Sequence, residues 1–321
     1  MYVHSTIQYI EELPVTHTAH LIMQQQQHYT IPLLSLTTSQ VLENCKLLEG
    51  RTDDNSPPTL FICSYPKSGT TWMQAIVYNI ISNGNQQFQH ISNFSPFYEI
   101  TATWDLATNS IQSKYDAMHK RYNCRAFNTH LLWEMMPSNA GMKYIYVVRR
   151  GKDVALSLYK HLSNQDDTDC YQGSFTEFLQ RWCDGQLIYG NWLDHISSWV
   201  NRSHSDADDR VLIMKYEDLI VDLHSCVMKV VEFLKQSDHL CRDRATLELT
   251  NYMTFSYMKE HQEQFMPISV PWKEGFSFIR NGIVGDSANY FTATDHCMFD
   301  EMVRRKFSDG IPTWLRELDV L

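Results

Sequence analysis

Short apolar runs recur along the chain, separated by segments with helical periodicity. Four segments predict strands, at residues 59–63, 125–129, 144–148 and 211–214, and the first of them is a nearly continuous apolar run. Nearly continuous apolar runs of this length are typical of strands buried on both faces. Apolar residues three or four positions apart predict helices at residues 70–81, 154–159 and 227–234. Asp153 stands where the N-cap of the second helix is expected.

The alternation of strands with helices predicts the fold class. We expect an α/β fold in which a central parallel β-sheet is flanked by helices on both faces. The first 30 residues are polar and contain four consecutive glutamines, so we interpret residues 1–30 as an N-terminal arm. A polar connector at residues 51–58 precedes the first strand, and no linker is evident after it. Residues 31–321 are therefore predicted to form a single domain.

Charge and cysteine usage narrow the function classes. The 321-residue chain has a formal net charge of −10, which argues against nucleic acid as a partner because phosphate backbones are bound by clustered cations. A small anion remains a possible ligand, since a few cations in a cleft can outweigh the global charge. None of the eight cysteines forms a Cys-x-x-Cys pair, and scattered thiols suit a reducing compartment. No apolar run reaches the length of a membrane span. We expect a cytosolic location and no membrane association.

The most informative segment is residues 64–72, Ser-Tyr-Pro-Lys-Ser-Gly-Thr-Thr-Trp. It lies between a predicted strand and a predicted helix, where backbone N–H groups and the helix dipole favour an anion. Gly69 permits close approach of the backbone, and Lys67 adds a positive charge. The order differs from the nucleotide-triphosphate P-loop, in which the lysine follows the second glycine. The segment thus predicts a P-loop-like site for a phosphate or related anion.

Four further segments extend this pattern, at residues 146–157, 185–192, 215–219 and 278–286. Together with residues 64–72 they resemble the motifs of the cytosolic sulfotransferase family, in family order, over about residues 59–310. The resemblance implies an enzyme of the EC 2.8.2 type that uses 3′-phosphoadenosine 5′-phosphosulfate (PAPS) and releases adenosine 3′,5′-bisphosphate (PAP). The implied acceptor is a hydroxyl of a small, largely apolar phenol or alcohol.

The same resemblance assigns residues to the nucleotide. The residues implied at the 5′-phosphosulfate are Lys67, Ser68, Gly69, Thr70 and Thr71. Those implied at the 3′-phosphate are Arg149, Ser157, Arg280, Asn281 and Gly282. Trp72 and Phe255 match positions whose rings flank the adenine, with Tyr216 and Thr254 nearby. Arginine suits the 3′-phosphate because its planar fork donates two parallel hydrogen bonds.

His130 is the candidate general base. It follows the predicted strand at residues 125–129, at the strand end where open α/β sheets bind ligands. Its imidazole could accept the acceptor's proton during in-line attack on sulfur. Lys67 would stabilise the leaving phosphate, and Ser157 completes the implied catalytic set. No carboxylate cluster suited to Mg²⁺ is evident, so we expect no metal.

The implied acceptor site comprises Phe94, Phe97, Asn128, His130 and Trp133. Asn128 departs from the family, because many phenol-type members carry lysine there. A second departure lies near the C-terminus. The family's usual dimer motif corresponds to Ala288, Thr292, Ala293 and Cys297, where both of its charged residues and its valine are missing, so we expect a monomer or a dimer formed through another surface. Residues 163–173 and 260–275 are expected to be mobile lids.

Three alternatives remain from the sequence. A kinase-like phosphotransferase would share the α/β fold. It requires a different order of glycine and lysine in the phosphate loop, and carboxylates that bind Mg²⁺. A sulfotransferase of the secretory pathway is disfavoured by the cysteines and by the missing signal anchor. A protein that binds the nucleotide without turnover would retain the phosphate sites without needing His130 and Lys67.

Overall fold

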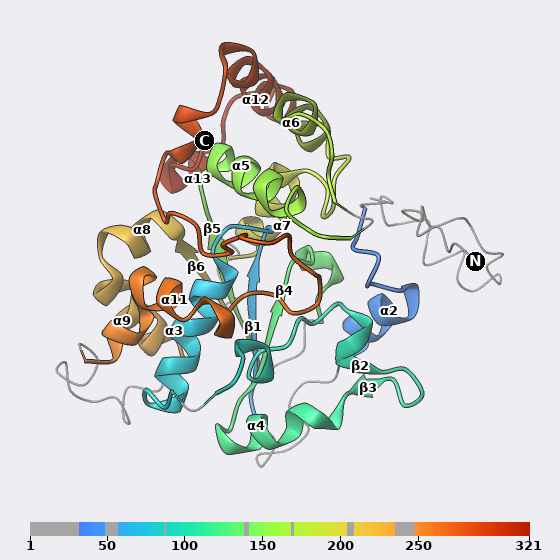
Figure 1. The fold of residues 1–321 in the computed structure, drawn as a ribbon, viewed down its shortest axis with the longest axis vertical. Helices are drawn as coiled ribbons and strands as arrows, with labels where there is room; N and C mark the ends of the chain where they lie inside the picture. Colours follow the sequence, from blue (N-terminus) through green and yellow to red (C-terminus); the bar gives the residue numbers. More distant parts are fainter. Residues whose placement is uncertain are drawn as a thin grey trace.

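The computed structural model describes residues 32–48, 57–86, 88–137, 141–167, 170–203, 209–234 and 248–321. The predicted arm at residues 1–30 lies outside them. In the described part, four parallel strands form a sheet in the order β4-β1-β5-β6 (Figure 1). Their bounds are β1 (Thr59–Ser64), β4 (Arg125–Thr129), β5 (Met142–Val148) and β6 (Val211–Lys215). All four predicted strands are therefore confirmed.

Both faces of the sheet are apolar, which explains the nearly continuous hydrophobic runs. In β1, Phe61 and Cys63 belong to one buried cluster, whereas Leu60 and Ile62 belong to a second. Successive side chains of a strand point to opposite faces, so each face has its own core. Helices on both faces are thus required to cover the sheet.

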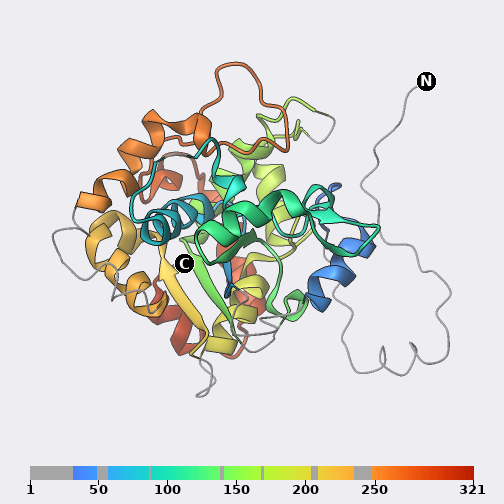
Figure 2. The same cartoon turned by 90° about the horizontal axis from the view of Figure 1, so that it is seen from below.

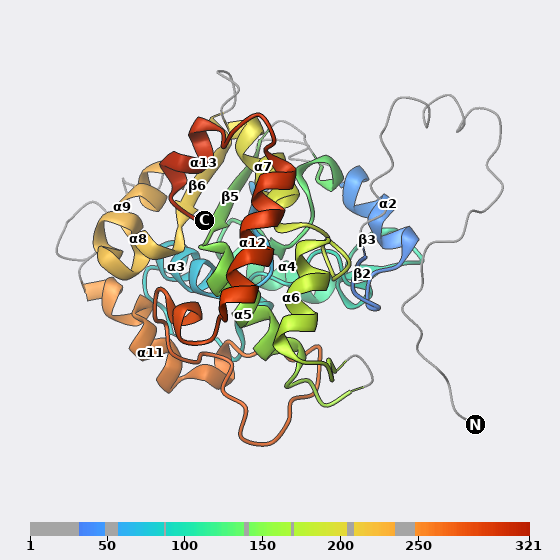
Figure 3. The ribbon, with the colours of Figure 1, turned by 90° about the horizontal axis from the view of Figure 1, so that it is seen from above.

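The first core is covered by α2 (Ser39–Leu47), α5 (Gly151–Leu162), α6 (Phe175–Cys183), α7 (Trp192–Ser203), α12 (Ala293–Lys306) and α13 (Thr313–Leu318). Figure 3 shows α5, α6 and α12 side by side. The second core is covered by α3 (Thr70–Ser82), α8 (Tyr216–Val221), α9 (Leu223–Leu234) and α11 (Phe255–Glu260). In Figure 2, α8, α9 and α11 are the yellow-to-orange helices on the left. The predicted α/β fold with helices on both faces is confirmed.

Smaller elements complete the described part. β2 (Trp104–Asp105) and β3 (Ser110–Ile111) form an antiparallel pair, and α4 (Asp116–Arg121) follows them. No described helix combines the length and the apolar character that crossing a bilayer would need.

The prediction that Asp153 is an N-cap is wrong. α5 begins at Gly151, with Arg150 at the N-cap position, so Asp153 lies inside the first turn. Its carboxylate accepts hydrogen bonds from the backbone N–H groups of Gly285 (2.7 Å) and Ser287 (2.9 Å). Asp153 therefore anchors the C-terminal loop against α5, a long-range contact that the local sequence pattern did not reveal.

Candidate functional site

The carboxyl ends of the four strands open into one cavity of about 480 Å³. His130 follows β4, Lys67 follows β1, Arg149 follows β5 and Tyr216 follows β6, and all four line the cavity. Parallel strands bring their carboxyl ends to the same edge of the sheet, which is where ligands of open α/β folds bind. The fold thus gathers residues that are far apart in the sequence.

The loop between β1 and α3 is held in a conformation that suits an anion. Gly69 is the N-cap of α3 and has φ of 115°, in the region that favours glycine. A Cβ atom at this position would lie 2.8 Å from Cδ2 of Tyr216. Lys67 also has a positive φ, of 69°. The amino terminus of α3 faces the cavity, and no side chain caps it. Backbone N–H groups at the start of the helix therefore remain available to an anion.

Three cations converge near this loop. One guanidinium Nη atom of Arg149 donates to the main-chain oxygen of Lys67 (3.2 Å), and its guanidinium lies 4.2 Å from the ring centroid of Tyr216. The Nε atom of Arg149 is buried without a partner. Arg280 forms an ion pair with Asp286 (2.6 Å). A buried donor without an acceptor is costly, so the site suits an anionic group that would satisfy it.

The ammonium of Lys67 is perturbed by these surroundings. Burial, reinforced by the nearby charges of Arg149 and Arg280, lowers the pKa of Lys67 to about 7. An anion bound between the three cations would reverse this effect, because opposite charge favours the protonated amine. The site is therefore electrostatically prepared for a negatively charged ligand.

An aromatic slot lies beside the cationic residues. The rings of Trp72 and Phe255 have centroids 6.2 Å apart, and the Trp72 indole donates from Nε1 to the main-chain oxygen of Met253 (2.6 Å). The ring of Tyr216 lies 5.4 Å from that of Trp72. Gly282 has φ of 63°, and a Cβ atom there would meet the Phe255 ring at 2.7 Å. Such a slot can hold a flat heteroaromatic ring.

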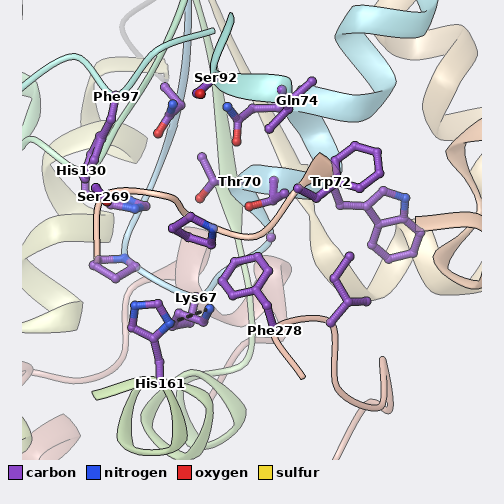
Figure 4. A pocket seen from close by; sticks show the side chains of 18 of the residues that line it. Lys67, Thr70, Trp72, Gln74, Ser92, Phe97, His130, His161, Ser269 and Phe278 are labelled. Carbon is purple, nitrogen blue, oxygen red and sulfur yellow. Dashed lines mark hydrogen bonds between the residues drawn. The ribbon is translucent and has the colours of Figure 1, made fainter. Parts of the chain in front are cut away.

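His130 stands at the far side of the cavity, beside Phe97 (Figure 4). Its Nδ1 atom lies 2.7 Å from the main-chain oxygen of Ser64. A carbonyl oxygen only accepts, so Nδ1 carries the proton and Nε2 has the free lone pair. Burial, together with the charge of Lys67, lowers the pKa of His130 to about 4, although the hydrogen bond to Ser64 opposes the shift. The imidazole is therefore neutral at pH 7 and can accept a proton at Nε2.

A buried carboxyl group fixes the backbone of His130. Glu99 is fully buried, and its Oε1 accepts from the N–H of His130 (2.7 Å) and from the hydroxyl of Tyr189 (3.1 Å). Burial raises the pKa of Glu99 to about 7. The main-chain oxygen of His130 is in turn hydrogen-bonded to Nε2 of His195 (2.8 Å). Neither Glu99 nor His195 was predicted from the sequence, because their links to His130 span 31 and 65 positions.

The structure assembles most, but not all, of the predicted residues. Those on the cavity wall are Lys67, Gly69, Thr70, Thr71, Trp72, Phe97, Asn128, His130, Arg149, Ser157, Tyr216, Phe255, Arg280, Asn281 and Gly282. Ser68 is 1% exposed and does not line the cavity. Thr254 caps α11 by accepting from the N–H of Tyr257 (3.2 Å). Neither Ser68 nor Thr254 lines the cavity, and their contact with the nucleotide stays a prediction.

Two of the predicted acceptor residues lie elsewhere. Phe94 is fully buried and packs against Tyr78, at 5.2 Å between ring centroids, on the side of α3. Trp133 packs against Tyr144 (5.1 Å) and Trp199 (5.3 Å). Both rings belong to the packing of the cores rather than to the cavity wall, which corrects the expectation that they contact the acceptor.

The two segments expected to be lids contact each other. Gln165 and Trp272 form an antiparallel bridge, and the N–H of Lys273 donates to the oxygen of Asn164 (3.0 Å). Gln165 of the first segment and residues 267–270 of the second line the cavity, and so do residues 276–283, which follow the second segment. The two segments thus close over the cavity as one paired unit; their mobility stays a prediction.

The sequence interpretation missed two further cavity residues. His161 lies on α5, four residues after Ser157, and Phe278 lies two residues before Arg280. Positions four apart in a helix share a face, so the spacing to Ser157 could have identified His161. Among the described residues, no group of three His, Cys, Asp or Glu side chains could hold a metal ion.

This geometry agrees with comparisons to known proteins. The family described as Sulfotransferase domain matches residues 57–310. Sulfotransferase 1B1 of Canis lupus familiaris is 30% identical over 275 residues, covering 83% of this chain and 87% of the relative. Human Sulfotransferase 1E1 is 31% identical over 279 residues, with coverages of 84% and 88%. The chain belongs to the sulfotransferase family and is an enzyme of that family.

Solved structures support the fold. Mouse sulfotransferase SULT7A1, complexed with PAP, superposes with a TM-score of 0.66 at 24% identity, covering 91% of this chain and 97% of that one. Retinol dehydratase in complex with androsterone and PAP gives a TM-score of 0.65 at 19% identity, with coverages of 86% and 88%. At these identities the similarity concerns the fold.

Proposed function

We propose that the protein transfers a sulfuryl group from PAPS to the hydroxyl of a small, largely apolar phenol or alcohol, without a metal. The observation that carries this proposal is one cavity with a cationic end at Lys67, Arg149 and Arg280 and a neutral imidazole of His130 at its far side. Family membership supports the reaction type. The cavity supports an arrangement with the donor at its cationic end and the acceptor beside His130.

The cationic end supports a nucleotide with phosphate groups at two positions. The amino terminus of α3 and Lys67 would hold the 5′-phosphosulfate, assisted by the hydroxyls of Thr70 and Thr71. Arg149, Arg280 and Ser157 would hold the 3′-phosphate, with the partnerless Nε of Arg149 as an available donor. The adenine would occupy the slot beside Trp72 and Phe255. Mouse SULT7A1 and retinol dehydratase, which share the fold, were both solved in complex with PAP, and this agrees with the assignment.

The proposed mechanism divides the chemistry between two residues. Nε2 of His130 removes the proton of the acceptor hydroxyl as its oxygen forms a bond to sulfur. The bond between sulfur and the bridging phosphate oxygen breaks, and the electron pair remains on that oxygen, where Lys67 neutralises the charge. The sulfuryl group moves in line between the two oxygens. PAP and the sulfate ester are the products.

The acceptor end supports a neutral molecule. Phe97, Ile100, Ile188 and Val270 supply apolar walls, and Asn128 is one of the polar groups that line the same cavity. The Nδ2 atom of Asn128 donates to the main-chain oxygen of Ser95 (2.7 Å), so this amide is already engaged. Apolar walls with a few placed polar groups favour a small phenol or alcohol.

The first experiment measures sulfuryl transfer from labelled PAPS to a panel of phenols, steroids and aliphatic alcohols. His130→Ala and Lys67→Ala are compared with His296→Ala and Lys120→Ala, which lie outside the cavity. Loss of His130 should lower turnover about 100- to 10,000-fold while PAP binding by calorimetry is retained. A wild-type protein that binds PAP but sulfates no acceptor would contradict the proposal and favour a nucleotide-binding role.

The location and the assembly state complete the proposal. Seven described cysteines are free thiols, which supports a cytosolic location. The altered C-terminal motif supports a monomer, or a dimer through another surface.

A further inference from the structure

The ammonium of Lys67 has a side-chain partner that the proposed mechanism does not use. Nζ of Lys67 lies 3.2 Å from Nδ1 of His161, which comes from the last turn of α5, 94 positions away. The Phe278 ring lies on the other side of the ammonium, 4.0 Å from Nζ to the ring centroid. Figure 4 shows Lys67 and His161 pointing toward one another beside Phe278.

The chemistry of this contact fixes the role of each group. When Lys67 is protonated, its ammonium only donates hydrogen bonds, so Nδ1 of His161 is then the acceptor and the imidazole is neutral. Burial, together with the charge of Lys67 and the neighbouring His130, lowers the pKa of His161 well below its usual value. A protonated His161 would place two cations in contact inside the cavity. The neutral ring instead offers the ammonium a lone pair.

The other groups that face Lys67 cannot take this role. Arg149 approaches from the end of β5 and Arg280 from the C-terminal loop, and both oppose its charge. Lys160 on α5 also lines the cavity. His130, at the end of β4, donates from Nδ1 to Ser64, and within the described part of the chain the side-chain hydrogen bond of Lys67 Nζ goes to His161. Among the described residues, no aspartate or glutamate lines the cavity. His161 is therefore the acceptor that offsets the cost of burying this cation.

Residues 260–275, the second of the two segments expected to be lids and hereafter called the lid, contact His161. The His161 ring lies 4.8 Å from the ring of Trp272 and 6.0 Å from that of Phe278. Trp272 belongs to the segment paired with Gln165, and its indole donates to the main-chain oxygen of Pro267 (2.9 Å). His161 thus links three parts of the chain: it lies on α5, it contacts Lys67 in the loop after β1, and it packs against Trp272 in the lid.

We propose that His161 is a positioning residue that holds the Lys67 ammonium by a hydrogen bond inside the cavity until the donor's bridging oxygen takes its place. The proposal rests on the role proposed for Lys67. Without His161, the free enzyme contains more neutral Lys67, because the ammonium loses its acceptor while the cations remain. The donor binds the protonated form, so its KM rises. At saturating donor the bound anion keeps Lys67 protonated, so kcat changes little.

The test compares His161→Phe with His161→Asn. Phenylalanine retains an aromatic ring beside Trp272 but has no acceptor, whereas the Asn carbonyl oxygen can replace Nδ1. For His161→Phe we expect the KM for PAPS to rise about tenfold at pH 8 for each unit by which the pKa of Lys67 falls, and much less at pH 6. The kcat should stay within about twofold. His161→Asn should restore most of the wild-type KM.

A second readout does not require turnover. PAP binding is measured by calorimetry at pH 7.5 in two buffers with different ionisation heats. His161→Phe should take up more protons on binding than wild type, and thermal unfolding checks that both variants are folded. Equal KM values in wild type and His161→Phe, or a change that is the same at pH 6 and pH 8 and is not rescued by asparagine, would overturn the proposal.

The same experiment separates this proposal from the proposed function. If wild type transfers no sulfuryl group, the proposed reaction fails. If wild type is active and Lys67→Ala has the turnover of wild type, the role of Lys67 fails, and with it that of His161. If both hold and only the variant comparison fails, the positioning role of His161 alone is rejected.

Discussion

Nδ1 of His130 donates to the main-chain oxygen of Ser64 across 2.7 Å, and this bond joins the ends of β4 and β1. It selects the tautomer in which Nε2 is unprotonated, so the sheet itself orients the base. Ser64 also places its hydroxyl 2.5 Å from that of Thr70, the first residue of α3. One residue thus contacts both the base and the start of the anion-binding helix.

The pH dependence of activity follows from the lowered pKa values of His130 and Lys67. The pKa of His130 is lowered to about 4, so the base is neutral well below the usual histidine range. The pKa of Lys67 is lowered to about 7, and its protonated form is needed. We expect kcat/KM to rise near pH 4 and to fall above about pH 7. In kcat the basic limb should move to higher pH, because the bound donor favours the ammonium. A kcat/KM profile whose acid limb lies at the ordinary histidine pKa of about 6.5 would contradict this.

Glu99 is predicted to support His130 through hydrogen bonds rather than through charge. Glu99→Gln keeps an acceptor for the His130 N–H and the Tyr189 hydroxyl, and should retain most activity. Glu99→Ala leaves both donors buried and unpaired, at about 1–3 kcal/mol each, and should lower both Tm and kcat. Thermal unfolding and initial rates measure the two effects. If Glu99→Gln is as impaired as Glu99→Ala, a charged carboxylate is required.

Glu99 also predicts a pH dependence of stability. Its folded pKa, about 7, is raised above its ordinary value of 4.5, so the protonated form favours folding. This contribution is present below pH 4.5 and is lost as the pH rises through 7. Glu99→Gln should remove that part of the slope when unfolding free energy is measured between pH 5 and 8. An unchanged slope would assign the effect to another group.

Gly69 and Gly310 form a matched pair for the phosphate loop. Their φ angles are 115° and 111°, but a Cβ at Gly69 would meet Tyr216 at 2.8 Å, whereas nothing lies within 4 Å of one at Gly310. Backbone strain alone should cost about 1–3 kcal/mol in either alanine variant. Gly69→Ala should additionally weaken PAP binding, measured by calorimetry. Equal PAP affinity in the two variants would show that the close approach at Gly69 is not needed.

The charge of the cavity predicts which acceptors are rejected. Five cations line it, namely Lys67, Lys114, Arg149, Lys160 and Arg280, and no described carboxylate does. An acceptor with an ammonium group would be desolvated without a partner. Tyramine should therefore have a kcat/KM at least about tenfold below that of 4-ethylphenol, which has the same ring and hydroxyl. Equal values for this pair would contradict a site for neutral acceptors.

The C-terminal region predicts the assembly state. Thr292 is the one residue of the family's dimer motif that this chain keeps, and it forms a capping box with Asp295 at the start of α12; the charged residues of the motif are replaced by Ala288 and Cys297. We expect light scattering to give the mass of one chain over a wide concentration range. A concentration-independent dimer mass would instead require contact through another surface.

The sequence by itself determined the strands and the loops that follow them. Strands β1 and β5 have apolar residues directed to both faces of the sheet, so their apolar runs are nearly continuous and their bounds can be predicted to within a residue or two. The phosphate loop directly follows β1, and His130 directly follows β4. Sequence order therefore sufficed to place them at one edge of the sheet.

Only the tertiary structure decided which side chains meet. Aromatic residues near a motif can pack in a core or line a cavity, and local sequence does not separate Phe94, which packs on Tyr78, from Phe97, which faces His130. The capping pattern at Asp153 could not reveal the distant N–H groups that its carboxylate binds. The contact between Lys67 and His161 joins positions 94 residues apart. Local propensity acts over a few residues, whereas such contacts depend on how the β1 loop, α5 and the lid pack around one buried charge.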